Sequence, residues 1–193
     1  MTQRNVIGSS PIEITNQIFS LMAESANMEY YGEDVSQLEH ALQCAKLAAD
    51  VRSDDETVIA ALLHDIGHIC DPDAEQMGDV GAVDHEGIGA DFLLGLGFSE
   101  KVAELVRAHV VAKRYLTFAK PAYAAKLSPA SVETLTHQGG PMTADEAAAF
   151  EQDPLFNEKL RMRSWDEQGK IPGLTVPPLE SYQAMILAHL TGT

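Results

Sequence analysis

The chain has 193 residues, of which 45% are hydrophobic and 22% are charged, which is the composition of an ordinary globular protein. Only 13 lysines and arginines stand against 29 aspartates and glutamates, so the formal net charge is −16. Nucleic acids and anionic membranes require clustered cations, so this charge argues against both as partners. It leaves open a small anionic substrate, which needs only a few cations in a pocket.

The length corresponds to one domain, 1–193, with 1–10 as an N-terminal tail. No apolar run is long enough to cross a bilayer, and the first residues contain no apolar segment typical of a secretory signal. Two cysteines, Cys44 and Cys70, make no disulfide framework. We therefore expect a cytoplasmic protein with two reduced, buried thiols.

The hydrophobic periodicity is helical nearly throughout, and no alternating pattern predicts a strand. Capping boxes, prolines in first turns and glycines after last turns mark the expected helices. Three of these helices are predicted only by their start, at residues 10, 128 and 143. The others are expected over 36–49, 54/55–69, 84–96, 99–115, 154–166 and 179–190. Longer connections are expected at 71–83 and 115–127. The sequence therefore predicts an all-α fold that forms a single compact helical domain.

Five of the seven histidines lie at chemically suggestive positions: His40, His64, His68, His85 and His109. Asp65 follows His64 within an apolar run, and burying both groups is unfavourable unless something binds them. Imidazole nitrogen and carboxylate oxygen are ligands of divalent iron, manganese and zinc. His68, four residues after His64, is expected on the same helix face. A lone core histidine is usually structural, but this set favours a metal centre.

The ordered set of His40, His64-Asp65 and the distant Asp166 resembles the HD-domain superfamily of metal-dependent phosphohydrolases. His85 and His109 are similar to the additional ligands of its dinuclear branch. Motifs outside the ligands narrow the resemblance to the HD-domain mixed-valent di-iron oxygenases that cleave a carbon–phosphorus bond. These motifs are the segments 30–40, 63–68, 97–100, 109–115, 138–142 and 163–167. The similarity extends from about residue 15 to residue 190.

The resemblance implies an all-α HD-domain fold and a non-haem di-iron dioxygenase of phosphonate catabolism. Its substrate would be 1-hydroxy-2-aminoethylphosphonate or the N-trimethyl form, oxidised to glycine or glycine betaine plus phosphate. The implied cofactors are two Fe ions in the mixed-valent Fe(II)/Fe(III) state, with O2 as co-substrate. An upstream 2-oxoglutarate-dependent hydroxylase would supply the substrate. The implied ligands are His40, His64, Asp65 and Asp166 for one iron, and Asp65, His85 and His109 for the other.

The resemblance also implies roles for two residues of the segment before His40. Tyr30 matches the family's tyrosine, which occupies an iron position in the resting site and leaves when substrate arrives. Glu33, three residues further on, would move with it. Asp65 would bridge the two irons, so these three residues are the candidates for direct catalytic roles.

A phosphonate needs cations and hydrogen-bond donors. Lys113 follows His109 by one helical turn, His68 follows His64 in the same way, and Arg163 precedes Asp166 by three residues. Ser131, Thr134 and Gln138 are weaker candidates for further hydrogen bonds. All six are expected to bind the substrate.

The choice between the two amine substrates rests on weaker signals. Asp84 stands immediately before His85 among small residues, and a carboxylate with room around it suits a bulky quaternary ammonium. Aromatic side chains such as Tyr31 or Phe118 would add cation–π attraction. These features favour the trimethylated substrate and leave the primary amine open. Two other functions also stay open: hydrolysis of a phosphate ester, and an inactive HD domain that binds a ligand or partner.

Overall fold

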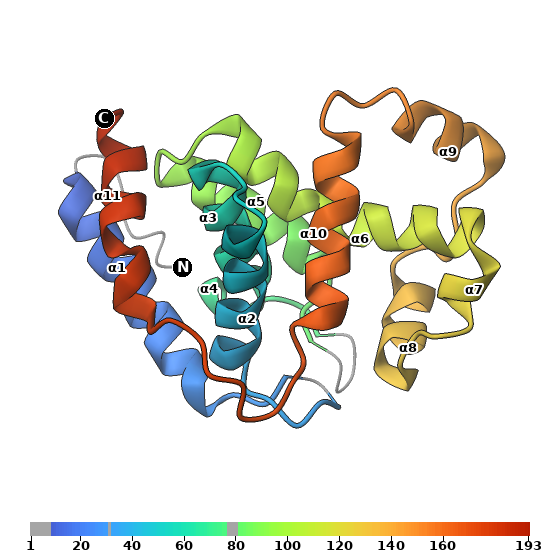
Figure 1. The fold of residues 1–193 in the computed structure, drawn as a ribbon, viewed down its shortest axis with the longest axis horizontal. Coiled ribbons are helices and arrows are strands. Elements are labelled where there is room, and N and C mark those ends of the chain that lie inside the picture. Colours follow the sequence, from blue (N-terminus) through green and yellow to red (C-terminus); the bar gives the residue numbers. More distant parts are fainter. Residues whose placement is uncertain (1–8, 31, 77–80) are drawn as a thin grey trace.

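The computed structural model describes residues 9–30, 32–76 and 81–193, and within these ranges the fold is all-helical (Figure 1). The only β-pairing in the described ranges is two isolated bridges, Glu29 with Ser36 and Gln76 with Ala82. The expected all-α class is therefore confirmed. Among the described helices, none has the length and apolar character needed to cross a membrane.

The helices are, in chain order, α1 (Pro11–Glu24), the 3-10 helix η1 (Ser25–Asn27), α2 (Gln37–Asp50), α3 (Asp55–Leu63), α4 (Gly67–Cys70), α5 (His85–Gly95), α6 (Glu100–Ala119), α7 (Pro121–Ala124), α8 (Pro129–His137), α9 (Ala144–Phe150), α10 (Phe156–Gln168), η2 (Leu179–Tyr182) and α11 (Gln183–Thr191). The predicted capping boxes form at Ser10, Ser36 and Thr143, where each side chain accepts a backbone hydrogen bond and a glutamate reaches back. Of the expected N-terminal tail, 1–8 lies outside the described residues.

Helices α2, α3, α5, α6 and α10 pack around one apolar core, and α1 and α11 lie side by side at one end (Figure 1). Ile59, Leu93 and Met162 are among its fully buried side chains. The C-terminal half of α6 extends beyond this core, and α7 to α9 gather around it (Figure 1). A second apolar cluster, which includes Tyr115 and Phe150, packs there. The region where the two parts meet holds the functional site.

The prediction of one continuous helix over 54/55–69 is wrong, because the structure has two helices, α3 and α4, which are separated by 64–66. The backbone tightens there, because Ile66 N–H bonds to Leu63 O at 3.1 Å and His68 N–H bonds to Asp65 O at 3.0 Å, each three residues back. His64 and His68 therefore belong to different helices and do not share one continuous helical face. This break is the local feature that sets the direction of Asp65.

Two further expectations need correction. Helix α6 continues to Ala119 rather than ending near Tyr115, because Tyr115 and Leu116 are buried in the second apolar cluster. The connection expected at 115–127 contains the short helix α7, with Pro121 in its first turn. Both cysteines are free, as expected, but Cys70 is only half-buried.

The contact between α4 and α5 generates a stability prediction. A Cβ added at Gly67 would meet the carbonyl oxygen of His85 at 1.8 Å, and neither backbone can move without displacing a helix. We expect Gly67→Ala to lower the free energy of unfolding by about 3 kcal/mol, at the upper end of overpacking effects. Gly95→Ala is the matched control, because a Cβ at Gly95 meets nothing within 4 Å. Denaturant unfolding measures both, and equal stability of the two variants would contradict the close packing.

Candidate metal centre

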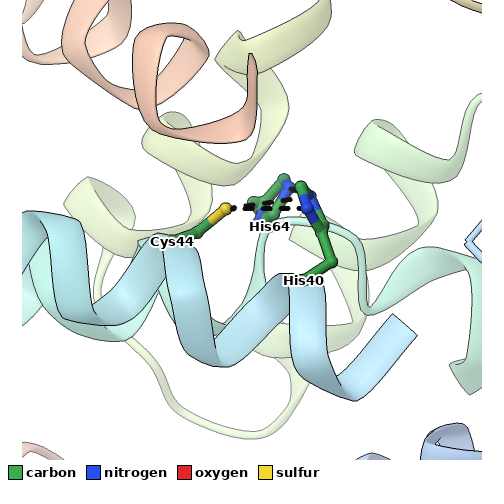
Figure 2. Close-up of side chains that lie close together, drawn as sticks. All are labelled: His40, Cys44 and His64. Atoms are coloured by element: carbon green, nitrogen blue, oxygen red, sulfur yellow. Dashed lines mark hydrogen bonds between the residues drawn. The ribbon is translucent and has the colours of Figure 1, made fainter. Parts of the chain in front are cut away.

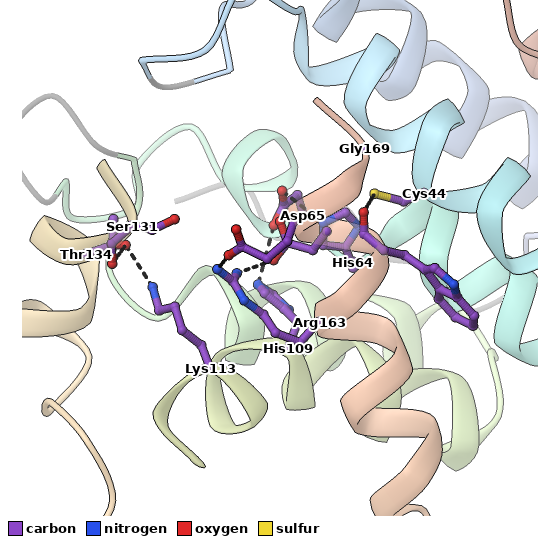
Figure 3. Close-up of polar contacts among 12 residues, drawn as sticks. Cys44, His64, Asp65, His109, Lys113, Ser131, Thr134, Arg163 and Gly169 are labelled. Carbon is purple, nitrogen blue, oxygen red and sulfur yellow. Dashed lines mark hydrogen bonds and ion pairs between the residues drawn. The ribbon is translucent and has the colours of Figure 1, made fainter. Parts of the chain in front are cut away.

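Six side chains from five helical segments converge at the junction of the two apolar clusters. They are His40 on α2, His64 and Asp65 at the end of α3, His85 at the start of α5, His109 in α6 and Asp166 on α10. The four histidines and Asp166 are buried, and the Asp65 side chain is only 10% exposed. The structure therefore brings together all six residues predicted as ligands. Figure 3 shows His64, Asp65 and His109 directed toward one another, with Arg163 beside them.

Asp65 lies between two pairs of histidines. Its Oδ2 atom lies 3.2 Å from His64 Nε2 and 3.5 Å from His40 Nε2. Its Oδ1 atom lies 3.4 Å from His109 Nε2 and 3.5 Å from His85 Nε2. Each carboxylate oxygen thus serves a different pair, which is the arrangement that a carboxylate shared by two metal ions requires.

The hydrogen bonds of the rings show which nitrogens are left to bind a metal. His40 Nδ1 lies 2.9 Å from Gly169 O, and His64 Nδ1 lies 2.9 Å from Ala61 O; each must donate, because a carbonyl only accepts. Both neutral rings therefore present an unprotonated Nε2, yet these two atoms lie 3.1 Å apart. Two neutral rings in this position would direct lone pairs at each other, so the contact is favourable only with a proton on one Nε2 or a metal ion between them. The donor set therefore fits a metal ion.

The second pair shows the same feature. His109 Nδ1 donates to Val106 O at 2.7 Å, and its Nε2 lies 2.9 Å from His85 Nε2. The Asp65 Oδ2 atom is buried without a hydrogen-bond partner in the described structure. An orphaned carboxylate oxygen among four imidazoles is unfavourable, and a bound cation removes this penalty.

Neighbouring charged groups and burial shift the pKa values of the histidines at the site. Burial lowers the pKa of His64, but the neighbouring carboxylates of Asp65 and Asp166 outweigh burial and raise that pKa to about 9. Burial lowers the pKa of His40 and of His109 to about 4. The two carboxylates thus favour a positive charge at His64 Nε2, which a metal ion bound there would supply in place of a proton.

Asp166 joins the metal centre to two neighbours. Its Oδ1 atom lies 3.6 Å from His40 Nε2 and accepts a hydrogen bond from Tyr30 Oη at 3.2 Å. Its Oδ2 atom forms a short ion pair with Arg163, one turn earlier on α10. Against the effect of burial, the Arg163 charge holds the pKa of Asp166 well below its usual value. Asp166 is therefore fully ionised and available as a ligand. Trp165 beside it is buried in the main core.

Cys44 is one turn from His40 on α2, and its thiol approaches the same rings (Figure 2). Its Sγ atom lies 3.7 Å from His40 Nε2 and 4.0 Å from His40 Nδ1. An atom nearly equidistant from both ring nitrogens lies along neither lone pair, so Cys44 is a packing neighbour of the ring and not a co-ligand with it. Its thiol donates to Trp165 O at 3.5 Å.

A small pocket opens beside the metal centre, with a volume of about 60 Å³, well below the roughly 300–1,000 Å³ of sites for drug-sized ligands. The sequence-predicted residues that line it are Tyr30, Glu33, Asp65, His68, His85, His109, Lys113, Ser131, Thr134, Gln138, Arg163 and Asp166. Lys113 is buried and donates to Thr134 Oγ1 at 2.8 Å (Figure 3). Arg163 is buried and donates from Nε to Tyr123 Oη at 2.8 Å. The pocket thus holds two buried basic side chains, of which Arg163 also pairs with the carboxylates of Asp166 and Glu167.

The segment before α2 covers one side of the pocket. The Tyr30 ring stacks on the His40 ring, with centroids 3.9 Å apart. Glu33 pairs with Lys170, whose Nζ atom lies 3.4 Å from Glu33 Oε1 and 5.5 Å from the centre of the Tyr30 ring. Tyr30 and Glu33 therefore lie against the metal centre together.

His68 and Asp84 are both predicted to bind the substrate, but only His68 lines the pocket. His68 reaches the pocket from α4, where its Nδ1 accepts from Ala82 N–H at 3.1 Å and its ring stacks on His85. Asp84 is exposed and does not line the pocket; its carboxylate is turned toward Gly87. The backbone at Asp84 is left-handed (φ 54°), and the pocket gives no support to the predicted role of Asp84 in substrate binding. Phe118 is exposed and Tyr31 lies outside the described residues.

Two charged residues at the site were missed from the sequence. Lys170 lines the pocket beyond the end of α10, and no spacing rule places it there. Glu86 follows His85 directly, and its carboxylate lies beside that ring. The adjacency of Glu86 to a predicted ligand is a signal in the sequence that indicates a place at the site.

Comparisons with known proteins agree with this geometry. A 39% identical relative over 93% of this chain and 90% of its own length is named hydroxymethylphosphonate dioxygenase, from Gimesia maris. A 40% identical relative over 82% of this chain and 81% of its own is named [1-hydroxy-2-(trimethylamino)ethyl]phosphonate dioxygenase (glycine-betaine-forming), from Leisingera caerulea. An uncharacterized mimivirus protein, L432, is 37% identical over 93% of this chain and 83% of its own. The HD domain family model matches 38–139, and this chain belongs to the HD domain family.

Proposed function

We propose that this protein is a di-iron dioxygenase that cleaves the C–P bond of a small 1-hydroxyphosphonate. One O2 and one hydroxyphosphonate would yield one carboxylic acid and one inorganic phosphate; all four electrons come from the substrate, so no external reductant is consumed. The observation that carries the proposal is Asp65, with one carboxylate oxygen on each histidine pair beside a pocket that holds buried Lys113 and Arg163. The names of two relatives support the same reaction class.

The metal ligands divide into two sets. His40, His64, Asp65 and Asp166 would hold one iron, and Asp65, His85 and His109 the other. Bound there, the irons would supply Lewis acidity toward the substrate's oxygens and the redox chemistry that O2 requires. We propose iron as the metal and O2 as the co-substrate. A C1-hydroxylation of a phosphonate is the class of reaction that must supply the substrate.

The protein's own side chains bind and orient the anion. Lys113 and Arg163 are buried on the pocket wall and offer charged donors to phosphonate oxygens, with Ser131, Thr134 and Gln138 as neutral neighbours. Gln138 Oε1 is buried and has no partner in the described structure; this oxygen only accepts, so it would serve the substrate's hydroxyl or ammonium group and not its phosphonate oxygens. Buried cations in a small cavity hold the substrate in one orientation, which is the contribution positioning makes to catalysis.

We expect Tyr30 and Glu33 to move when the substrate binds. The Tyr30 phenol donates to a metal ligand, Asp166, and its ring covers another, His40. Substrate arrival would displace Tyr30 together with Glu33, which would break the Glu33–Lys170 ion pair. Gly32, at φ 74°, lies between them, in a conformation that favours glycine and supplies backbone freedom. The step resembles lid motions that commit a bound substrate.

The pocket does not distinguish between the candidate amine groups of the substrate. The exposed position of Asp84 removes the observation that favoured the trimethylated form. The primary amine and the trimethylammonium compound therefore stand as equal candidates, with hydroxymethylphosphonate as a third, smaller one suggested by the name of the Gimesia maris relative.

The direct test measures O2 consumption and phosphate release together. Iron-loaded protein is incubated with each of the three hydroxyphosphonates, in air and under anaerobic conditions. We expect phosphate from at least one compound, in a one-to-one ratio with O2 consumed, and none without O2. Phosphate release from a phosphate monoester in the absence of O2, with no reaction of the phosphonates, would replace the proposal by an HD phosphohydrolase.

Lys113 provides a pH-dependent prediction. Burial and the nearby Arg163 charge lower the pKa of Lys113 to about 7, so the ammonium is charged below that pH and neutral above it. We expect the KM for the phosphonate to rise as pH increases through about 7. Lys113→Met should raise KM at pH 6 by about 10–100-fold, equivalent to about 1.5–3 kcal/mol for a lost charged hydrogen bond.

The control for this prediction is Lys120→Met, which removes an exposed lysine at the end of the same helix, outside the pocket. Metal content should be normal in both variants, because neither lysine is a ligand. If Lys113→Met keeps the KM and the pH profile of the wild type, Lys113 does not contact the phosphonate.

A further inference from the structure

The four ligand histidines differ in what holds the ring nitrogen that faces away from the metal centre. In His40, His64 and His109 this atom, Nδ1, donates to a backbone carbonyl at 2.7–2.9 Å. In His85 it is buried without a hydrogen-bond partner in the described structure. The group beside it is the Glu86 carboxylate, whose Oε2 lies 3.5 Å away. That oxygen is also buried and also lacks a partner.

The other edges of the His85 ring are accounted for. Its Nε2 faces His109 at 2.9 Å and Asp65 Oδ1 at 3.5 Å, and its face stacks on the His68 ring with centroids 3.9 Å apart. The backbone of His85 lies against Gly67 so closely that a Cβ there would clash. The ring is thus held at Nε2 and on one face, whereas at Nδ1 two unpaired polar atoms lie 3.5 Å apart, within reach of a small rotation.

We propose that Glu86 is a positioning residue for the metal centre, which accepts a hydrogen bond from His85 Nδ1 when a metal ion is bound at His85 Nε2. This inference rests on the proposed two-metal site. The two metal positions would then differ in the partners of their histidines. His40 and His64 donate to neutral carbonyl groups, whereas His85 would donate to a carboxylate. A carboxylate partner orients an imidazole and increases its basicity, so it strengthens metal binding at that position.

The test counts metal ions rather than turnover. Metal-free protein is titrated with Mn2+, and the unbound ion is measured by its electron paramagnetic resonance signal. The wild type should bind two ions per chain. Glu86→Met, which removes the acceptor and keeps an unbranched side chain, should bind the first ion normally and the second about 10–100-fold more weakly, as for other partners of metal-bound histidines. Glu86→Gln, which keeps an acceptor oxygen, should recover part of that loss.

Asp84→Asn is the matched control, because it removes a carboxylate charge from the other side of His85 without touching the ring. Normal binding of both ions by Glu86→Met would overturn the inference. Equal losses in Asp84→Asn and Glu86→Met would also overturn it, since the effect would then be general electrostatics; loss of both ions in Glu86→Met and Glu86→Gln would show a structural role instead. A protein that shows the predicted pattern but releases no phosphate from hydroxyphosphonates would retract the proposed function alone.

Discussion

The structure depends on one carboxylate that faces two pairs of imidazoles. Asp65 presents Oδ2 to His64 and His40 and Oδ1 to His109 and His85, all between 3.2 and 3.5 Å. Four buried rings and a carboxylate packed this closely are unfavourable without added positive charge, because neutral rings would direct lone pairs at each other and a carboxylate oxygen stays unpaired. A bound metal ion supplies that charge. The surrounding helices therefore make sense as a scaffold for metal ions.

Local backbone features hold this arrangement in place. The tightened turns at 64–66 direct Asp65 between the histidine pairs, and Gly67 allows α4 to approach the backbone of His85. Carbonyl groups then set three of the four rings with Nε2 toward the centre. Ligand geometry is thus built from the ends and breaks of helices, where backbone groups are free to bind side chains. The long α6 carries both His109 and Lys113, and so links the candidate metal centre to the pocket beside it.

Sequence reasoning predicted the helices, and it named the six side chains that the structure brings together, because their signals are local or chemically distinctive. The capping boxes at Ser10, Ser36 and Thr143 depend on residues three apart, and they form as predicted. What it missed depends on tertiary contacts. Burial of Tyr115 extends α6, and Lys170 reaches the pocket from a non-helical segment. Periodicity and spacing contain no information on these, because distant parts of the chain determine them.

The central claim is that Asp65 is shared by two metal ions, and the most direct measurement is the magnetic behaviour of the loaded centre. Metal-free wild-type protein is given two equivalents of Mn2+ and examined by electron paramagnetic resonance at low temperature. The account predicts that both ions bind and that their spins are coupled through the shared carboxylate, so the spectrum differs from that of an isolated ion. A single bound ion, or two ions with the spectrum of isolated Mn2+, would contradict it.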